Sequence, residues 1–132
     1  MASLKLEDLH VYQLSERLAD AIWEVVSGWE RFARDSVGGQ LVRAADSIGA
    51  NIAEGYGRRT YADNKRFVRI ARGSLYEVRH FLRRADNRKL VGASGKKTIQ
   101  SLLTELAPRL NAYLRSIGRQ GRDKENEPDD HH

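Results

Sequence analysis

Residues 40–57 read Gln-Leu-Val-Arg-Ala-Ala-Asp-Ser-Ile-Gly-Ala-Asn-Ile-Ala-Glu-Gly-Tyr-Gly, and the spacing of their apolar side chains indicates the fold class. Apolar side chains recur in this stretch at steps of four, three and four residues, at Leu41, Ala45, Ile48 and Ile52. That spacing places them on one face of an α-helix and does not fit the two-residue alternation of a strand. We therefore predict a helix over residues 36–56. It ends at Gly55-Tyr56-Gly57, where a glycine can adopt the left-handed cap conformation cheaply.

The same periodicity runs through three further segments, which we predict to be helices over residues 7–29, 61–87 and 95–117. Thr60 and Asp63 have the spacing of an N-terminal capping box for the helix that follows them. The core face predicted for that helix consists of Phe67, Ile70, Ala71, Ser74, Val78, Phe81, Leu82 and Ala85. Pro108 lies inside the last segment, where it either kinks one helix or separates two short ones.

Four amphipathic helices joined by short connections favour an all-α fold, namely an antiparallel four-helix bundle with up-down-up-down order. We assign residues 1–118 to this single domain. Residues 119–132 are rich in charged side chains and poor in apolar ones, which predicts a disordered acidic tail. We interpret the final pair, His131 and His132, as the remnant of a purification tag.

The composition favours binding over catalysis. The chain has 132 residues and no cysteine, which excludes disulfides, thiolate metal sites and thiol nucleophiles. Two of its four histidines are the last two residues, so few side chains suit general acid-base chemistry. We expect no enzyme activity, no cofactor and no metal. No apolar run approaches the roughly 20 residues of a membrane span, and no signal peptide begins the chain, so we expect a cytoplasmic protein without membrane contact.

Basic residues concentrate in one segment. The net charge of +5 is too small to identify a partner, but residues 58–89 contain eleven basic and three acidic side chains, a local charge of +8. Five of these cations and one aromatic residue share a face of the predicted helix 61–87. We call these six the basic stripe: Lys65, Arg69, Arg72, Tyr76, Arg79 and Arg83.

The basic stripe admits two interpretations. Evenly spaced cations along a helix suit the phosphate backbone of a nucleic acid, and Tyr76 would be available for stacking on a base. Alternatively, the stripe is a solvated face, or it pairs with acidic side chains such as Glu16 or Glu24 of a neighbouring subunit. The chain has no zinc-finger spacing, RNP-type aromatic motif or GXXG loop that would favour the first interpretation further.

Small and polar residues border the predicted core. The predicted polar seam consists of Ser47, Asn51, Glu54, Ser74 and Glu77. Such residues let two helices approach closely and hydrogen-bond across the contact, and any that are buried need partners. A catalytic cluster is the alternative, but the seam lacks a histidine or lysine to act as base. The pattern favours a structural network.

At these residues the sequence resembles a known family. The segments Ser47-Ile48-x-x-Asn51-Ile52-Ala53-Glu54-Gly55-x-Gly57-Arg58 and Ile70-Ala71-Arg72-Gly73-Ser74-Leu75-Tyr76-Glu77 are similar to the signature of the four-helix bundle proteins encoded in intervening sequences of bacterial 23S rRNA genes. A related branch comprises the accessory proteins of diversity-generating retroelements, in which a basic pentamer binds reverse transcriptase and nucleic acid. The resemblance covers about residues 4–117 and implies a left-handed bundle, a bacterial cytoplasmic protein and a homopentamer. It implies no reaction, because the family has no established activity.

Exposed aromatic residues favour self-association independently. Tyr12 and Trp23 fall on one side of the first predicted helix, away from its apolar stripe, and are candidates for an oligomer interface, with ordinary packing as the alternative. We therefore hypothesise a non-enzymatic, self-associating helical bundle that binds nucleic acid, structured RNA in particular, through the basic stripe. The alternative is an interaction scaffold whose basic stripe meets an acidic protein or its own neighbouring subunit.

Overall fold

The computed structural model describes residues 5–125, and the side chains of residues 5–121; within that range it contains four long helices and no strand. The long helices are α1 (His10–Ser27), α3 (Gly39–Tyr56), α4 (Tyr61–Asn87) and α5 (Ala93–Glu125). A short 3-10 turn, η1 (Leu6–Asp8), precedes α1, while α2 (Arg31–Ala33) and the π-helix η2 (Arg34–Gly38) lead into α3. The prediction of an all-helical fold is confirmed.

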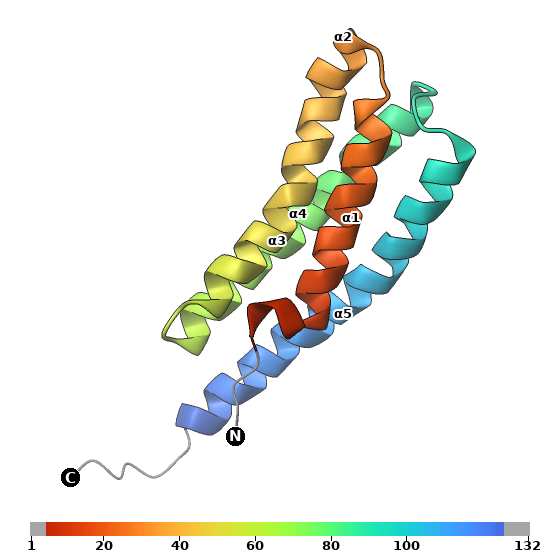
Figure 1. The fold of residues 1–132 in the computed structure, drawn as a ribbon. Helices are drawn as coiled ribbons and strands as arrows, with labels where there is room; N and C mark the ends of the chain where they lie inside the picture. The colour runs from red at the N-terminus through yellow and green to blue at the C-terminus, as the bar shows by residue number, and fades with distance from the viewer. Residues whose placement is uncertain (1–4, 126–132) are drawn as a thin grey trace, which may run out of the picture.

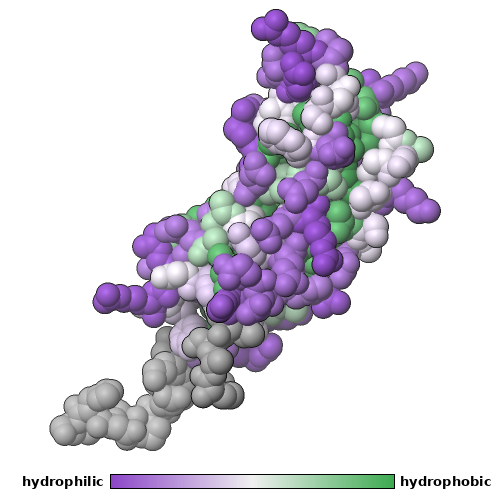
Figure 2. Space-filling model, viewed as in Figure 1, coloured by the Kyte–Doolittle hydropathy of each residue, from purple (hydrophilic) through white to green (hydrophobic). Residues whose placement is uncertain are grey.

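Each long helix packs against two others, so the four enclose one apolar core (Figure 1). α1 and α4 each contact both α3 and α5, and the contact between α3 and α4 is the most extensive. The side chains without any exposed surface include Leu14, Leu18, Ile22, Leu41, Ile48, Ile52, Val68, Val78, Ile99 and Leu106. The face shown in Figure 2 is mainly hydrophilic, and hydrophobic surface is confined to smaller patches on it. Among residues 5–125, no helix is both long and apolar enough to cross a membrane.

The core face of α4 differs from the predicted one. Val68 and Leu75 are buried although the prediction left them out, whereas Ile70 is 43% exposed and Phe67 is only half-buried. The difference arises because α4 packs against both α3 and α5. A helix with two neighbours buries the part of its surface that faces both of them. This part of the surface is turned toward Val68 and Leu75, which leaves Ile70 at its outer edge.

The ends of α4 show one predicted cap and one unpredicted conformation. The Thr60 hydroxyl accepts a hydrogen bond from the Asp63 backbone N–H at 3.1 Å, which confirms Thr60 as the N-cap. Beyond the other end of α4, Lys89 has a φ of 61°, in the left-handed region that glycine occupies at lower cost.

The end of α3 corrects another expectation. Gly57 has a φ of −79°, and no glycine in the described range has a positive φ, so no left-handed cap forms there. Gly55 instead permits a close approach between α3 and α4. A Cβ at Gly55 would lie 2.7 Å from Asn64 Oδ1 and 3.0 Å from the Asn64 carbonyl oxygen.

The connection between α1 and α3 is helical over most of its length, which the sequence pattern did not predict. The Glu30 carboxylate caps α2 by accepting hydrogen bonds from the backbone N–H groups of Phe32 (2.9 Å) and Ala33 (2.7 Å). η2 then continues directly into α3, so helical structure begins five residues before the predicted start at residue 36. This π-helical turn also lines a pocket described below.

α5 is one continuous helix with Pro108 inside it, which excludes the two short helices that the sequence left open. Pro108 is exposed, and the helix changes direction along its length in Figure 1. α5 extends to Glu125, beyond the predicted end at residue 117. Residues 119–125 of the predicted tail are therefore helical, and the remainder of that tail, residues 126–132, lies outside the described range.

Candidate nucleic-acid interface

The basic stripe follows the side of α4 that borders α5. Arg69, Arg79 and Arg83 are exposed, and Lys65 and Arg72 are half-buried. Arg72 Nη1 donates a hydrogen bond to Asn111 Oδ1 of α5 at 3.4 Å, which joins the middle of the stripe to the neighbouring helix. The stripe thus flanks the core on the α5 side and extends about 27 Å from Lys65 to Arg83 at the rise of an α-helix.

None of the five cations in the stripe forms an ion pair with a carboxylate whose position the structure describes. Other basic residues of α4 and its flanks are paired: Arg66 with Asp63 at 3.7 Å and Arg58 with Glu54 at 2.6 Å. Asp86 lies near the end of the stripe, but it pairs with Lys96 at 2.8 Å. The charges of the stripe are therefore available to an external anion.

Both ends of the stripe open into hollows between α4 and α5. At one end, Lys65 and Arg69 line a hollow of about 440 Å³ together with Tyr61 and Gly118. At the other end, Arg79 and Arg83 line a hollow of about 400 Å³ whose α5 side includes Lys96, Gln100 and Thr104. The polar side chains of α5 enlarge the stripe into a surface that spans two helices. Asn111 and Gln100 were not predicted to belong to it, because the sequence pattern of one helix does not show which side of α5 faces α4.

Tyr76 lies near the centre of the stripe and is 59% exposed. The guanidinium carbon of Arg79 lies 6.0 Å from the centroid of the Tyr76 ring, at the outer limit of a cation–π contact. An exposed aromatic ring between cations is the arrangement that stacks an unpaired base while the neighbouring charges contact phosphates.

The predicted polar seam is only partly assembled. Ser47 Oγ and Ser74 Oγ lie 2.9 Å apart across the contact between α3 and α4, and Asn51 Nδ2 donates to Ser47 Oγ at 3.0 Å and to the Ser47 carbonyl oxygen at 2.8 Å. Glu54 is exposed and pairs with Arg58, and Glu77 is also exposed, so neither carboxylate belongs to the network. The three-residue network satisfies Ser74, which is 5% exposed, and thereby holds α3 and α4 together.

A second polar contact, in the first turn of α4, was not predicted. Burial raises the pKa of Tyr113 above its ordinary value of 10.0, a hydrogen bond with the Asn64 side chain opposes the shift, and Tyr56 adds to it. Asn64 Oδ1 is buried without a hydrogen-bond partner within the described part of the chain. Both side chains lie on the edges of apolar stripes, and sequence periodicity gives no signal for such a pair.

The two candidate interface residues of α1 differ. Trp23 is 62% exposed and remains available to a partner. Tyr12 is partly buried and packs against the hydrophobic core of its own chain, so less of its side chain is available to a partner. Trp23 alone keeps the exposure that the interface hypothesis requires.

In the described part of the chain, no three or more His, Cys, Asp and Glu side chains cluster so that they could hold a metal ion. His10 Nε2 lies 3.3 Å from Glu105 Oε1 at the surface, and the His80 ring packs edge-on against Phe81 with centroids 5.1 Å apart. The surface with the strongest chemical character is the basic stripe, which suits the binding of a polyanion.

Comparison with known proteins agrees with the helical fold. A crystal structure of a protein of unknown function from the S23 ribosomal protein family of Bacteroides thetaiotaomicron VPI-5482 superposes with a TM-score of 0.69 at 22% sequence identity, covering 79% of this chain and 97% of that one. A search of curated proteins finds no match. The family model described as 23S rRNA-intervening sequence protein matches residues 7–112. The chain therefore belongs to the 23S rRNA-intervening sequence protein family.

Proposed function

We propose that this protein is a non-enzymatic, self-associating helical bundle that binds structured RNA through the basic stripe of α4. The observation that supports this most is the row of five cations without carboxylate partners among the side chains that the structure describes. Solvated helix faces usually mix both signs of charge, whereas this face presents one sign beside an exposed tyrosine. The proposal includes a cytoplasmic location and no membrane contact.

The proposal extends to architecture. We propose the up-down-up-down order and left-handed twist expected for the bundle, and the order is supported by Figure 1, where successive connections lie at alternate ends. We also propose a homopentamer, with Trp23 in the contact between subunits. In a ring the stripe would repeat with the symmetry, so several weak sites would act together on one RNA.

The test is the affinity of the full chain for a labelled RNA hairpin with single-stranded flanks, measured by fluorescence anisotropy at about 50 mM salt and above. If all five cations contact phosphates, the slope of log K against log salt is about −4. Replacing Arg69, Arg72 and Arg79 together by Glu should abolish binding. Replacing Arg17, Arg31 and Arg59 by Glu makes the same change in net charge on other surfaces and should largely preserve binding.

Two controls separate binding from folding. Arg72 bonds to Asn111, so a second variant, with Glu at Arg69, Arg79 and Arg83, leaves that contact intact and should also lose binding. Far-UV circular dichroism should report unchanged helicity for every variant. Failure of the unmutated protein to bind, or equal binding by the stripe and control variants, would overturn the proposal.

A second candidate is supported by the acidic side of α1. Glu16, Asp20 and Asp46 line a hollow of about 230 Å³ between α1 and α3. These negative charges complement the basic stripe of a neighbouring copy, and an acidic protein would complement the stripe in the same way. Native mass spectrometry of protein purified from its own cells distinguishes the two candidates. It gives the subunit count and shows whether nucleic acid accompanies the protein, while cross-links from Arg69 or Arg72 to Glu16 or Glu24 of a neighbour would favour the scaffold.

A further inference from the structure

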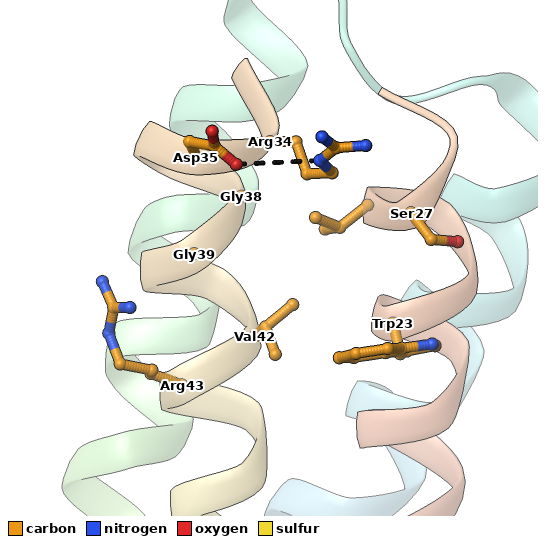
Figure 3. A pocket seen from close by; sticks show the side chains of 9 residues that line it. Trp23, Ser27, Arg34, Asp35, Gly38, Gly39, Val42 and Arg43 are labelled. Carbon is orange, nitrogen blue, oxygen red and sulfur yellow. Dashed lines mark ion pairs between the residues drawn. The ribbon is translucent and has the colours of Figure 1, made fainter. Parts of the chain in front are cut away.

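A pocket of about 320 Å³ lies at the other side of the bundle from the stripe, between the last turns of α1 and the junction of η2 with α3. Trp23 and Val26 form its α1 wall, and Val42 forms its α3 wall. Figure 3 shows the Trp23 ring and the Val42 side chain projecting toward one another across the lower part of the pocket, with the Arg34 side chain across its upper end. The volume is at the lower end of the range for small-molecule sites, about 300–1,000 Å³.

Two consecutive glycines at the junction of η2 with α3 shape this pocket. A Cβ at Gly38 would lie 2.7 Å from Val26 Cγ1 and 3.0 Å from the Ala33 carbonyl oxygen, so only glycine lets the backbone close against α1 there. A Cβ at Gly39 would meet only the Arg43 guanidinium, at 3.4 Å and beyond. The pocket is therefore closed by backbone at Gly38, and the Arg43 side chain lies against Gly39. π-helical turns such as η2 are frequent at functional sites.

The indole ring of Trp23 is placed unusually for a structural residue. It is 62% exposed, whereas Trp29, the second residue after the end of α1, is partly buried and packs against the core. Leaving a large aromatic ring in water forgoes the favourable free energy of removing its apolar surface from water. A ring held over an apolar pocket recovers that free energy when a flat ligand stacks on it.

The rim of the pocket is positively charged. Asp35 pairs with Arg31 at 3.6 Å through one carboxylate oxygen and with Arg34 at 3.7 Å through the other, so one carboxylate is shared by two guanidiniums. Arg43 lies at the rim as well and forms no ion pair with any described carboxylate. An apolar slot with excess positive charge at its mouth complements a molecule that is flat and apolar at one end and anionic at the other.

We propose that this pocket binds a planar aromatic carboxylate. The aromatic ring stacks on the Trp23 indole and contacts Val42 and Val26 on the other walls. The carboxylate accepts hydrogen bonds from the Arg34 guanidinium at the open end. This site shares no residue with the basic stripe, so the proposal stands independently of RNA binding. It shares Trp23 with the subunit contact proposed above, and a ligand in the pocket and a neighbouring subunit on Trp23 exclude one another.

The test uses the ¹⁵N-labelled full chain titrated with 2-naphthoate and followed by ¹H–¹⁵N correlation spectra. The indole N–H signal of Trp23, assigned with a Trp23→Phe variant, and the amides of Gly38 and Gly39 should shift saturably, and the Trp29 indole signal should shift much less. The neutral analogue 2-naphthamide and the non-aromatic cyclohexanecarboxylate should each bind about tenfold more weakly or worse, since one lacks the charge and the other lacks the ring.

Two arginines provide a matched pair. Arg34→Gln removes the guanidinium that lines the pocket and should weaken 2-naphthoate binding roughly tenfold, while Arg31→Gln removes the other partner of Asp35 and should leave the affinity unchanged. Dispersed spectra of both variants show that they are folded.

Three results would overturn the proposal. The first is the absence of a Trp23 shift at millimolar 2-naphthoate, and the second is equal affinity of the two arginine variants or of naphthoate and naphthamide. The third is a Trp23 signal that shifts with protein concentration before any ligand is added and no longer responds to naphthoate, which would show that a second copy of the chain fills the pocket.

Discussion

Two glycines in neighbouring helices give opposite predictions for the same substitution. Gly55 of α3 is buried, and a Cβ there would lie 2.7 Å from Asn64 Oδ1 and 3.0 Å from both the Asn64 carbonyl oxygen and Phe67 Cβ. Gly73 of α4 is exposed, and a Cβ there would meet no atom within 4 Å. Gly55→Ala therefore tests the close contact between α3 and α4, and Gly73→Ala is its matched control.

The magnitudes follow from two terms. Alanine stabilises a helix interior relative to glycine by about 1 kcal/mol, and Gly73→Ala should receive all of it because nothing obstructs the methyl group. Gly55→Ala receives less because Gly55 is in the last turn of α3, and overpacking against backbone costs about 1–3 kcal/mol. We expect Gly73→Ala to stabilise by about 1 kcal/mol and Gly55→Ala to destabilise by about 1–2 kcal/mol.

The assay is urea denaturation followed by far-UV circular dichroism, at one fixed protein concentration because self-association would make stability concentration-dependent. With an unchanged m-value, the two midpoints should move in opposite directions, and the Gly73→Ala melting temperature should rise by roughly 4 °C. A stabilised Gly55→Ala variant would refute the close contact that the structure gives. A destabilised Gly73→Ala variant would show that another molecule covers this face of α4.

Three further predictions concern single side chains. Ser74→Ala and Ser47→Ala should each reduce the free energy of unfolding by about 1 kcal/mol. The double variant should lose less than the sum of the two, because both substitutions remove the same 2.9 Å hydrogen bond, and strict additivity in urea denaturation would contradict the network. Burial raises the pKa of Tyr113, so the contribution of its neutral phenol to stability is complete below about pH 10 and is lost as the pH rises through the folded-state pKa. Tyr113→Phe should therefore flatten the loss of stability measured between about pH 9 and pH 11. An unchanged slope would argue against the raised pKa. Lys89→Gly should raise the melting temperature, since glycine adopts the φ of 61° about 1 kcal/mol more cheaply, and a lowered value would mean that the Lys89 side chain is needed there.

The sequence predicted the helices well because long amphipathic periods and caps are local signals. Thr60 identified the start of α4, and the apolar spacing from Leu41 to Ile52 identified α3. The error in the core face of α4 arose because the sequence of a single helix does not reveal where its neighbours lie. Ile70 was placed in the core because the centre of its helix face was misjudged without knowledge of α5.

The candidate site was predictable to a lesser degree. The six residues of the stripe share a helix face, so sequence spacing suffices to group them. Their lack of carboxylate partners in the described structure, and the hydrogen bond from Arg72 to Asn111, depend on contacts between residues far apart in the chain. The pocket beside Trp23 depends on a π-helical turn, for which the sequence has no recognised pattern.

The packing order of the helices has a consequence for how the chain folds. α3 and α4 share the most extensive contact and are adjacent in sequence, so they can form an antiparallel pair with little loss of loop entropy. α1, by contrast, needs α5, the last helix of the chain, as its second neighbour. During synthesis from the N-terminus, the first three long helices therefore present an open apolar face until residues of α5 have emerged. We expect the α3–α4 pair to be formed in the folding transition state and the docking of α5 to be the closing step.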